Sequence, residues 1–268
     1  GHFVTLRSTK SQLLATLGFK LKGIKITWQN GNWRNNEWEQ NRTEQNRTEQ
    51  NIVIVGSSGH AKVIIDIIEK EGKFNIVGLL DAFKEIGESA FGYKILGEEK
   101  NLPELIKKYQ LLGCIIAIGD NWIRSIVKNK IQAIDASFEF VSSIHPSATI
   151  ARGVTIGSGT VIMAGAVVNS NSSIGDFCII NTNASIDHDS NMSDFSSVAP
   201  GVTTGGNISI GKFSAVSLGA NVIHGIKIGK HSVIGSGSTV LTNIDDYVVA
   251  YGTPAKITTE RKDDDKYL

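Results

Sequence analysis

The fold is decided by a stretch that starts at Ile144 and reads I-HPSATI-ARGVTI-GSGTVI-MAGAVV-NSNSSI-GDFCII-NTNASI up to Ile186. An aliphatic residue or methionine returns at every sixth position, and the pattern runs on to Val240 with Thr204 as its one polar member. No α-helix has this period, because helical faces repeat every 3.6 residues. A six-residue repeat instead fits a triangular prism. Each hexapeptide forms one short side and one corner, and three of them complete a coil of about 18 residues.

The other places of the repeat suit the inside and the corners of such a prism. Two residues before each aliphatic position the side chain is small or β-branched, as in Ala148, Ala166, Cys178, Ala184, Ser196 and Ala220. Three residues after it stand residues that tolerate the positive φ of a tight corner, as in Gly153, Gly159, Gly165, Asn171, Asn183, Gly201 and Gly219. The sequence therefore predicts a parallel β-helix over residues 144–258, with one internal column of aliphatic side chains and a C-terminal tail to residue 268.

A different pattern precedes the repeat, between residues 51 and 143. Ile52–Val55 is a short β-branched run that predicts a buried strand, and a helical pattern with one apolar face follows it. Further strands are expected at residues 76–80, 114–118 and 138–141, and further helices at 102–109 and 123–134. Strands that alternate with helices predict a small parallel α/β sheet, a Rossmann-like domain.

Residues 1–50 differ from the rest of the chain. They end in two copies of the polar segment NRTEQ, starting at Asn41 and Asn46, and such a repeat cannot build a hydrophobic core. We expect a disordered leader, an extended gene start or an expression remnant. The alternative is a partner-binding arm that uses Trp28, Trp33 and Trp38.

Composition narrows the function classes. A formal net charge of +1 gives no bias toward nucleic acid or an anionic membrane, and the longest apolar stretch, residues 111–118, is too short to span a bilayer. Cys114 and Cys178 both lie inside apolar runs, which favours buried thiols in a reducing compartment over a disulfide. We expect a cytoplasmic protein.

Four motifs carry a resemblance to a known family. They are Gly56-Ser-Ser-Gly59-His60, Ile118-Gly-Asp-Asn121 with Arg124, Ile186-Asp-His188-Asp189, and Gly252-Thr-Pro-Ala-Lys256. Residues 51–258 resemble the left-handed β-helix hexapeptide acyltransferases. The likeness is greatest to the family of sialic-acid O-acetyltransferases and nucleotide 4-amino-sugar N-acetyltransferases. The resemblance implies a left-handed coil, acetyl-CoA as co-substrate, a nucleotide-sugar acceptor and a homotrimer with acyl-transfer sites between the prisms.

Acetyl transfer from a thioester needs a proton acceptor and a donor for the developing oxyanion. His188 follows the inward Ile186 by two residues, and Gly206 lies 18 residues further on, which places it one coil above His188. Thr204 interrupts the apolar column on the same wall. The resemblance implies that His188 is the general base, that Asp189 orients its ring and that the Gly206 N–H holds the thioester oxygen. The plainer interpretation is an ordinary exposed histidine on a polar corner.

The resemblance also implies two binding sites. Coenzyme A would contact Ser197, Gly205, Gly206, Leu218, His224, Gly235 and Lys256, and Ser197 stands where relatives often carry a second histidine. The turn Gly56–Gly59 lies between a strand and a helix, where backbone N–H groups can approach a phosphate, although a tight turn alone would look the same. The nucleotide sugar would contact Ser58, Gly59, His60, Asp81, Gly119, Asn121 and Arg124.

These expectations combine into an acetyl-CoA-dependent N-acetyltransferase. It acts on a nucleotide-linked amino sugar of the UDP-4-amino-sugar type, for surface-glycan synthesis, with direct attack of the amine on the thioester and no metal. One alternative is a sialic-acid-type sugar O-acetyltransferase. Others are a zinc carbonic anhydrase of the same fold, which needs three converging histidines, and a non-catalytic binding module.

Overall fold

The computed structural model describes residues 26–29, 32–35 and 50–266 of a chain that divides into two units, Gly1–Glu49 and Gln50–Leu268. In the first unit, β1 (Ile26–Gln29) and β2 (Asn32–Asn35) pair antiparallel, with Trp28 opposite Trp33. The rest of the expected leader, Trp38 included, lies outside the described residues. No helix within the described ranges is both long and apolar enough to cross a membrane.

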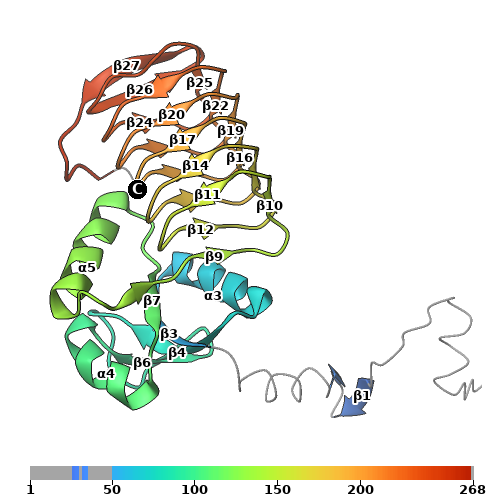
Figure 1. Cartoon of the computed structure of the whole chain (residues 1–268), viewed down its shortest axis with the longest axis vertical. Coiled ribbons are helices and arrows are strands. Elements are labelled where there is room, and N and C mark those ends of the chain that lie inside the picture. The colour runs from blue at the N-terminus through green and yellow to red at the C-terminus, as the bar shows by residue number, and fades with distance from the viewer. Residues whose placement is uncertain (1–25, 30–31, 36–49, 267–268) are drawn as a thin grey trace, which may run out of the picture. The chain divides into compact units, whose positions relative to one another are not determined.

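The second unit begins with a six-stranded sheet whose strand order is β5-β6-β4-β3-β7-β8 (Figure 1). All neighbours pair parallel except β5 and β6. The strands are β3 (Gln50–Val55), β4 (Phe74–Leu80), β5 (Ser89–Ala90), β6 (Tyr93–Gly97), β7 (Gly113–Ile116) and β8 (Glu139–Phe140). The helices are α3 (Gly59–Glu71), α4 (Leu102–Tyr109) after the 3-10 turn η1 (Glu99–Asn101), and α5 (Asn121–Ile134). This confirms the predicted parallel α/β domain, although the prediction missed β5 and β6.

Alternation along β3 explains why this sheet is covered on both sides. Ile52 and Ile54 pack with Ile64 and Ile68 of α3, whereas Val53 and Val55 belong to the core cluster of α4 and α5. Successive side chains of a strand point to opposite faces, so four consecutive buried residues require apolar cover on both sides. The buried run at residues 52–55 therefore fits the centre of the sheet.

The remaining chain coils into a triangular prism, and each of its three faces is a sheet of parallel strands. The face against which the α/β domain packs is called the covered face. The covered face contains β9 (Ser143–Ile144), β12 (Val161–Ile162), β15 (Ile179–Ile180), β18 (Ser197–Val198), β21 (Ala215–Val216) and β24 (Val233–Ile234). The second face contains β10 (Thr149–Ile150), β13 (Val167–Val168), β16 (Ser185–Ile186), β19 (Thr203–Thr204), β22 (Asn221–Val222) and β25 (Thr239–Val240). The third face contains β11 (Thr155–Ile156), β14 (Ser173–Ile174), β17 (Asn191–Met192), β20 (Ser209–Ile210) and β23 (Lys227–Ile228). The antiparallel pair β26 (Val248–Gly252) and β27 (Ala255–Glu260) extends the covered face.

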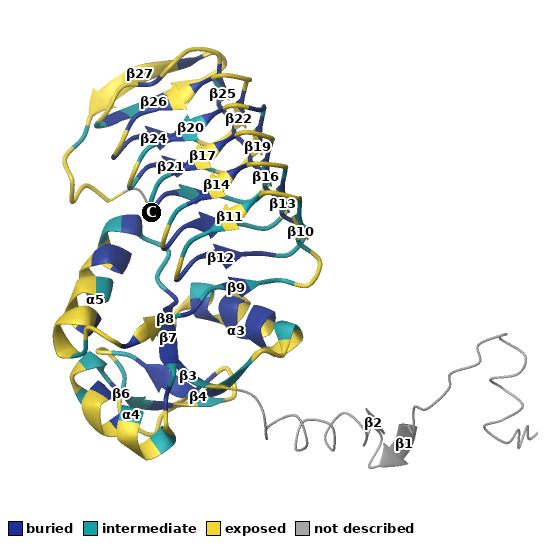
Figure 2. Ribbon diagram, in the orientation of Figure 1, coloured by how far each residue is buried: buried dark blue, intermediate teal, exposed yellow. Residues whose placement is uncertain are grey.

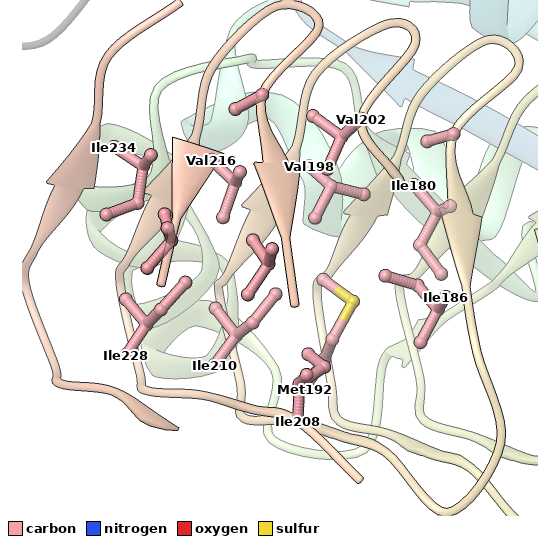
Figure 3. Packing of buried hydrophobic residues seen from close by; sticks show 14 of the residues in the cluster. Ile180, Ile186, Met192, Val198, Val202, Ile208, Ile210, Val216, Ile228 and Ile234 are labelled. Carbon is pink, nitrogen blue, oxygen red and sulfur yellow. The ribbon is translucent and has the colours of Figure 1, made fainter. Parts of the chain in front are cut away.

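The six-residue period becomes the internal column of the prism. Ile162 pairs with Ile180 and Ile180 with Val198, so successive coils stack in register. The inward side chains of the three faces meet in one core, shown for Ile180, Ile186, Met192, Val198 and their neighbours in Figure 3. Thr204 also points inward and is 5 % exposed. Its Oγ1 accepts a hydrogen bond from the Asp187 N–H at 3.2 Å.

The corners adopt the left-handed backbone conformation that the repeat predicted. Positive φ recurs three residues after each inward position from Ile150 to Ile234, at Gly153, Gly159, Gly165, Asn171, Asn183, Gly201 and Gly219 among others. At the corner between the third and covered faces, this conformation falls on aromatic residues instead. Phe177, Phe195, Phe213, His231 and Tyr247 all have φ between 53° and 63°, and their rings follow one another at centroid separations of 4.8, 5.3, 4.6 and 4.8 Å. We call these five side chains the aromatic ladder.

The α/β domain lies against the covered face. Val161 and Ile179 project outward from that face and pack with α3, and the Trp122 ring of α5 lies 5.4 Å from the ring of Phe213 in the ladder. Strands β12, β21 and β24 are consequently buried, whereas β11, β14 and β17 present exposed positions on the third face (Figure 2).

Candidate active site

His188 lies at the corner between the second and third faces, which we call the histidine corner (residues 187–190, 205–208 and 223–226). Its side chain is 51 % exposed, and its Nδ1 lies 2.8 Å from Asp189 Oδ2. Asp189 takes the positive-φ corner position, with φ of 56°. An ionised carboxylate only accepts hydrogen bonds, so the neutral imidazole donates its Nδ1–H to Asp189. This tautomer leaves the Nε2 lone pair available to accept a proton.

The histidine corner is fixed by a second carboxylate. Asp187 Oδ1 accepts from the His188 N–H at 2.8 Å and from Asn169 Nδ2 at 2.8 Å. The Asp187 N–H in turn donates to the inward Thr204. The polar residue that interrupts the apolar column thus anchors the backbone beside His188.

The neighbouring carboxylates set the protonation behaviour of the imidazole. The hydrogen bond that His188 donates to Asp189, together with the charge of Asp187, raises the pKa of His188 above its ordinary value of 6.5. The pKa of Asp189 is lowered by the same hydrogen bond, and that of Asp187 by its hydrogen bonds from Asn169 and the His188 N–H. His188 is therefore more basic than an isolated histidine, which suits a proton acceptor.

Gly206 lies one coil above His188, as the repeat predicted. A Cβ atom on Gly206 would stand 2.6 Å from His188 Nε2, so only glycine leaves room for the ring in this position. The His224 ring lies in the next coil, with its centroid 6.3 Å from that of His188. Among the backbone hydrogen bonds of residues 50–266, Gly206 accepts one from the Gly225 N–H and donates none. The basic nitrogen of His188 therefore lies beside a glycine whose N–H is unengaged.

A second group of predicted residues lies at the carboxyl ends of β3 and β4, which we call the strand edge (residues 56–60 and Asp81). The Gly56 N–H donates to Leu80 O at 2.8 Å, and Ser57 Oγ donates to Asp81 Oδ2 at 2.5 Å. Ser58 and Gly59 are exposed, and no side chain caps the start of α3. The N-terminus of this 13-residue helix therefore faces solvent beside Asp81.

His60 belongs to the first turn of α3 and is mostly buried. Burial, together with the charge of Arg124, lowers its pKa to about 4. Its Nε2 is enclosed and makes no hydrogen bond to the described residues. This imidazole is therefore neutral near pH 7.

Asn121 and Arg124 do not lie where the predicted nucleotide contacts require. Arg124 is 1 % exposed, and its guanidinium donates to Phe177 O at 3.0 Å, Ile118 O at 2.8 Å and Gly119 O at 3.0 Å. Asn121 is equally buried and donates to Ser197 Oγ at 3.1 Å. We correct the prediction: both side chains hold α5 and the loop before it against the prism, and burial leaves them no surface for a ligand.

The residues predicted for the coenzyme slot fall in three places. Gly205, Gly206 and His224 share the histidine corner. Leu218 and Gly235 lie at the corner between the covered and second faces. Lys256 is an exposed residue of β27. Ser197 lies on the outer side of the covered face, beneath Asn121. Ser197 is thus remote from His188 within one chain.

Comparison with known proteins places the chain in a family. Residues 51–131 match the family model of the PglD N-terminal domain. UDP-N-acetylbacillosamine N-acetyltransferase of Bacillus subtilis is 36% identical over 114 residues, 42% of this chain and 51% of that protein, so the chain spans about half the length of this curated relative. The structure of PerB from Caulobacter crescentus in complex with CoA and GDP-perosamine is 36% identical, with a TM-score of 0.72, over 78% of this chain and 97% of PerB. The acetyltransferase domain of PglB from Neisseria gonorrhoeae, in complex with acetyl coenzyme A, is 30% identical with a TM-score of 0.72 over 78% of this chain and all of that domain.

The chain belongs to this PglD-type acetyltransferase family. Its architecture is that of the family, an α/β domain followed by a left-handed parallel β-helix. Two of these solved relatives contain coenzyme A or its acetyl thioester. The resemblance seen in the sequence motifs is thereby confirmed.

The zinc alternative requires three converging histidines. His188 and His224 adjoin each other, but residues 50–266 contain no group of three or more His, Cys, Asp or Glu side chains that could hold a metal ion.

Sequence reasoning missed two residues that contact the candidate site residues. Asn169 lies one coil below Asp187 and could have been found by the same 18-residue step that located Gly206. Phe83 is 99 % exposed and follows Asp81 in a loop without a repeat to mark it. Only the structure shows that its N–H donates to Asp81 Oδ1, at 2.9 Å.

Proposed function

We propose that this protein transfers the acetyl group of acetyl-CoA to the amino group of a nucleotide-linked amino sugar. The observation that carries the proposal is the His188–Asp189 pair with Nε2 held in the space that Gly206 leaves open. PerB, whose structure was determined with CoA and GDP-perosamine, aligns along 97% of its length. That breadth of similarity supports both substrate classes for this chain.

The proposed reaction assigns one role to each group of the histidine corner. The acceptor amine attacks the thioester carbonyl and forms a C–N bond, while His188 Nε2 takes a proton from the nitrogen. The Gly206 N–H donates to the oxygen that becomes negative in the tetrahedral intermediate. Collapse of the intermediate breaks the C–S bond and releases coenzyme A as the thiolate, which the proton from His188 neutralises. Asp189 stabilises the imidazolium that exists between the two proton transfers.

The strand edge is the proposed nucleotide site. The uncapped N-terminus of α3 carries partial positive charge and unpaired N–H groups, both of which favour a diphosphate. Ser58 and Gly59 present that terminus without side-chain obstruction. His60 is neutral there and adds no charge, and because its Nε2 is enclosed only Nδ1 remains for a hydrogen bond to the diphosphate or the sugar.

We further propose a homotrimer whose sites combine residues of neighbouring copies. The histidine corner joins the second and third faces and is therefore the one corner that does not border the covered face. The strand edge belongs to the domain that packs on the covered face. Acceptor and base of one chain thus lie on opposite sides of the prism, and a neighbouring copy around a threefold axis can bring them together.

The cellular setting follows from the substrates. We place the enzyme in the cytoplasm, where acetyl-CoA and nucleotide sugars are made, in the supply of amino sugars for surface glycans. Cys114 and Cys178 support a reducing compartment, since both are buried free thiols, and burial raises the pKa of Cys178 to about 11.

The decisive experiment measures coenzyme A release from acetyl-CoA with a panel of UDP- and GDP-linked amino sugars. Matched UDP and GDP sugars that carry a hydroxyl in place of the amine serve as the control. We expect release only with the amine, and an amide product that resists alkaline hydroxylamine. An ester product would support the sugar O-acetyltransferase instead, and absence of release with every acceptor would refute the proposal.

A further inference from the structure

Phe83 is the most exposed large apolar side chain of the residues whose burial the structure describes, at 99 % of its possible surface. It lies in the loop between β4 and β5, immediately beyond the strand edge. Burying a phenylalanine side chain is ordinarily favourable. A ring left wholly in water beside a binding edge is therefore available to a ligand.

The loop that presents Phe83 is held by hydrogen bonds at both ends. The Phe83 N–H donates to Asp81 Oδ1, while the other oxygen of the same carboxylate accepts from Ser57. The Asp81 N–H donates to Gly97 O at 2.8 Å, and the Gly87 N–H donates to Ile95 O at 2.8 Å. Asp81 thus ties the position of the aromatic residue to the turn that opens α3.

This connection gives Asp81 a structural role besides the predicted contact with the nucleotide sugar. Sequence reasoning placed its carboxylate among the nucleotide-sugar contacts, and each of its oxygens also accepts a hydrogen bond from the protein. Ser57, its partner, is 5 % exposed and cannot turn away easily. The geometry makes Asp81 a positioning residue that sets the distance between the helix N-terminus and the Phe83 loop.

The location of the ring suggests what it binds. β3 and β4 are parallel neighbours, with Val55 opposite Leu80, so Gly56 and Asp81 continue them side by side at the carboxyl end of the sheet. In open parallel α/β sheets, ligands bind at this end. A nucleotide whose phosphates lie at the start of α3 carries a flat base that needs a surface beyond the phosphates, and every base has a π face suited to an aromatic ring.

We propose that Phe83 is the residue on which the nucleobase of the acceptor stacks. This inference rests on the proposed function, and it names the part of the acceptor that the histidine corner does not touch. Phe83 carries no polar atom, so it strengthens the binding of pyrimidine and purine nucleotides alike and leaves the choice between them to other groups.

The test measures binding of UDP and, separately, GDP to the full chain by calorimetry. Stacking on an aromatic side chain is worth about 1–3 kcal/mol per base, which corresponds to a loss of roughly 5- to 150-fold in affinity on Phe83→Ala. Phe83→Trp should retain the affinity of the wild type. Phe83→Leu, which is apolar but not aromatic, should lose most of it. Ile86→Ala is the matched control, since Ile86 lies in the same loop, is 71 % exposed and should not contact the base.

Two further measurements separate the possible outcomes. Acetyl-CoA affinity and mass by light scattering should be unchanged in Phe83→Ala; a loss of the assembled state would mean that the ring meets another copy of the chain, and would overturn the inference. Equal nucleotide affinity of Phe83→Ala and wild type would also overturn it while leaving the acetyl transfer intact. Failure of the wild type to bind either nucleotide or to release coenzyme A with any acceptor would instead refute the proposed function itself.

Discussion

At the scale of single residues, the site depends on one histidine whose two ring nitrogens have different neighbours. Nδ1 meets Asp189, and Nε2 meets the empty side-chain position of Gly206. The first contact fixes the tautomer, and the second is where we propose that the substrate approaches. Neither Asp189 nor Gly206 alone would distinguish His188 from His145, whose Nδ1 lies against Ser147 at an exposed corner.

The pKa of His188 leads to a pH prediction. Asp189 and Asp187 raise this pKa above its ordinary value of 6.5, so the neutral base should predominate only at pH values above the raised pKa. We therefore expect kcat/KM to increase as the pH rises through the pKa of His188. Asp189→Asn removes the first of these causes, so the rise should move to lower pH, with lower activity on the plateau. His188→Ala should reduce kcat by about 10²- to 10⁴-fold and abolish the rise. An unchanged pH profile in both variants, measured with acetyl-CoA saturating, would contradict the assignment.

Gly206→Ala tests the open space itself. The new Cβ would stand 2.6 Å from His188 Nε2, and the half-exposed ring can yield only by turning away from Asp189. We expect a loss of at least about tenfold in kcat, since misplacement by about 1 Å costs up to a hundredfold. The melting temperature should stay near that of the wild type, because a surface ring can move without disturbing the column. Normal turnover in a folded Gly206→Ala variant would show that the ring position is not required.

At the scale of elements, the prism corners show how far sequence patterns reach. The period of six, the inward column and the glycine or asparagine corners were all readable, because each depends on a local rule that every coil repeats. The aromatic ladder was not readable, because a phenylalanine with positive φ contradicts that rule. The unfavourable backbone conformation is offset by contacts between residues far apart in sequence, such as the stacking of Phe195 between Phe177 and Phe213. Buried Arg124 was misassigned for the same reason: its partner Phe177 O is 53 residues away.

The ladder should therefore contribute measurably to stability. Phe195 is 7 % exposed and packs in the core cluster shared by the ladder and the α/β sheet. Phe195→Ala should lower the free energy of unfolding by about 3 kcal/mol, as truncation of buried aromatic residues does, and Phe195→Leu by less. Phe83→Ala is the control, since a fully exposed ring should change stability by less than about 0.5 kcal/mol. Equal urea midpoints for Phe195→Ala and Phe83→Ala would show that the ladder is incidental.

At the scale of the whole molecule, the prism separates the two halves of the reaction. The α/β domain covers one face, and the histidine corner is the edge opposite that face. The strand edge of one chain therefore cannot serve its own His188 without a large movement of the domain. Arg124, Asn121 and the packing of α3 hold that domain in place. This arrangement supports the proposed catalysis between copies, whereas catalysis within one chain would require these buried contacts to break.

Mixed assemblies can decide between the two arrangements. His188→Ala removes the base and leaves the strand edge intact. Gly59→Glu places a carboxylate where the phosphates are expected, and its Cβ has no atom within 4 Å to disturb. An acidic residue at a helix N-terminus also favours the fold. Each variant alone should be nearly inactive, and both should form trimers of normal melting temperature.

If each site takes its strand edge from one copy and its base from the next, unfolding and refolding the two variants together in equal amounts should restore activity. A site works only when a His188→Ala copy supplies the strand edge and a Gly59→Glu copy supplies the base, which random assembly places together at about one site in four. The refolded mixture should therefore reach about a quarter of wild-type activity, while the two variants mixed without exchange should show none. If each chain serves its own base, no proportion of the two variants can create an intact site. Activity that stays at the level of the separate variants, in mixtures shown by mass spectrometry to have exchanged subunits, would exclude the shared site.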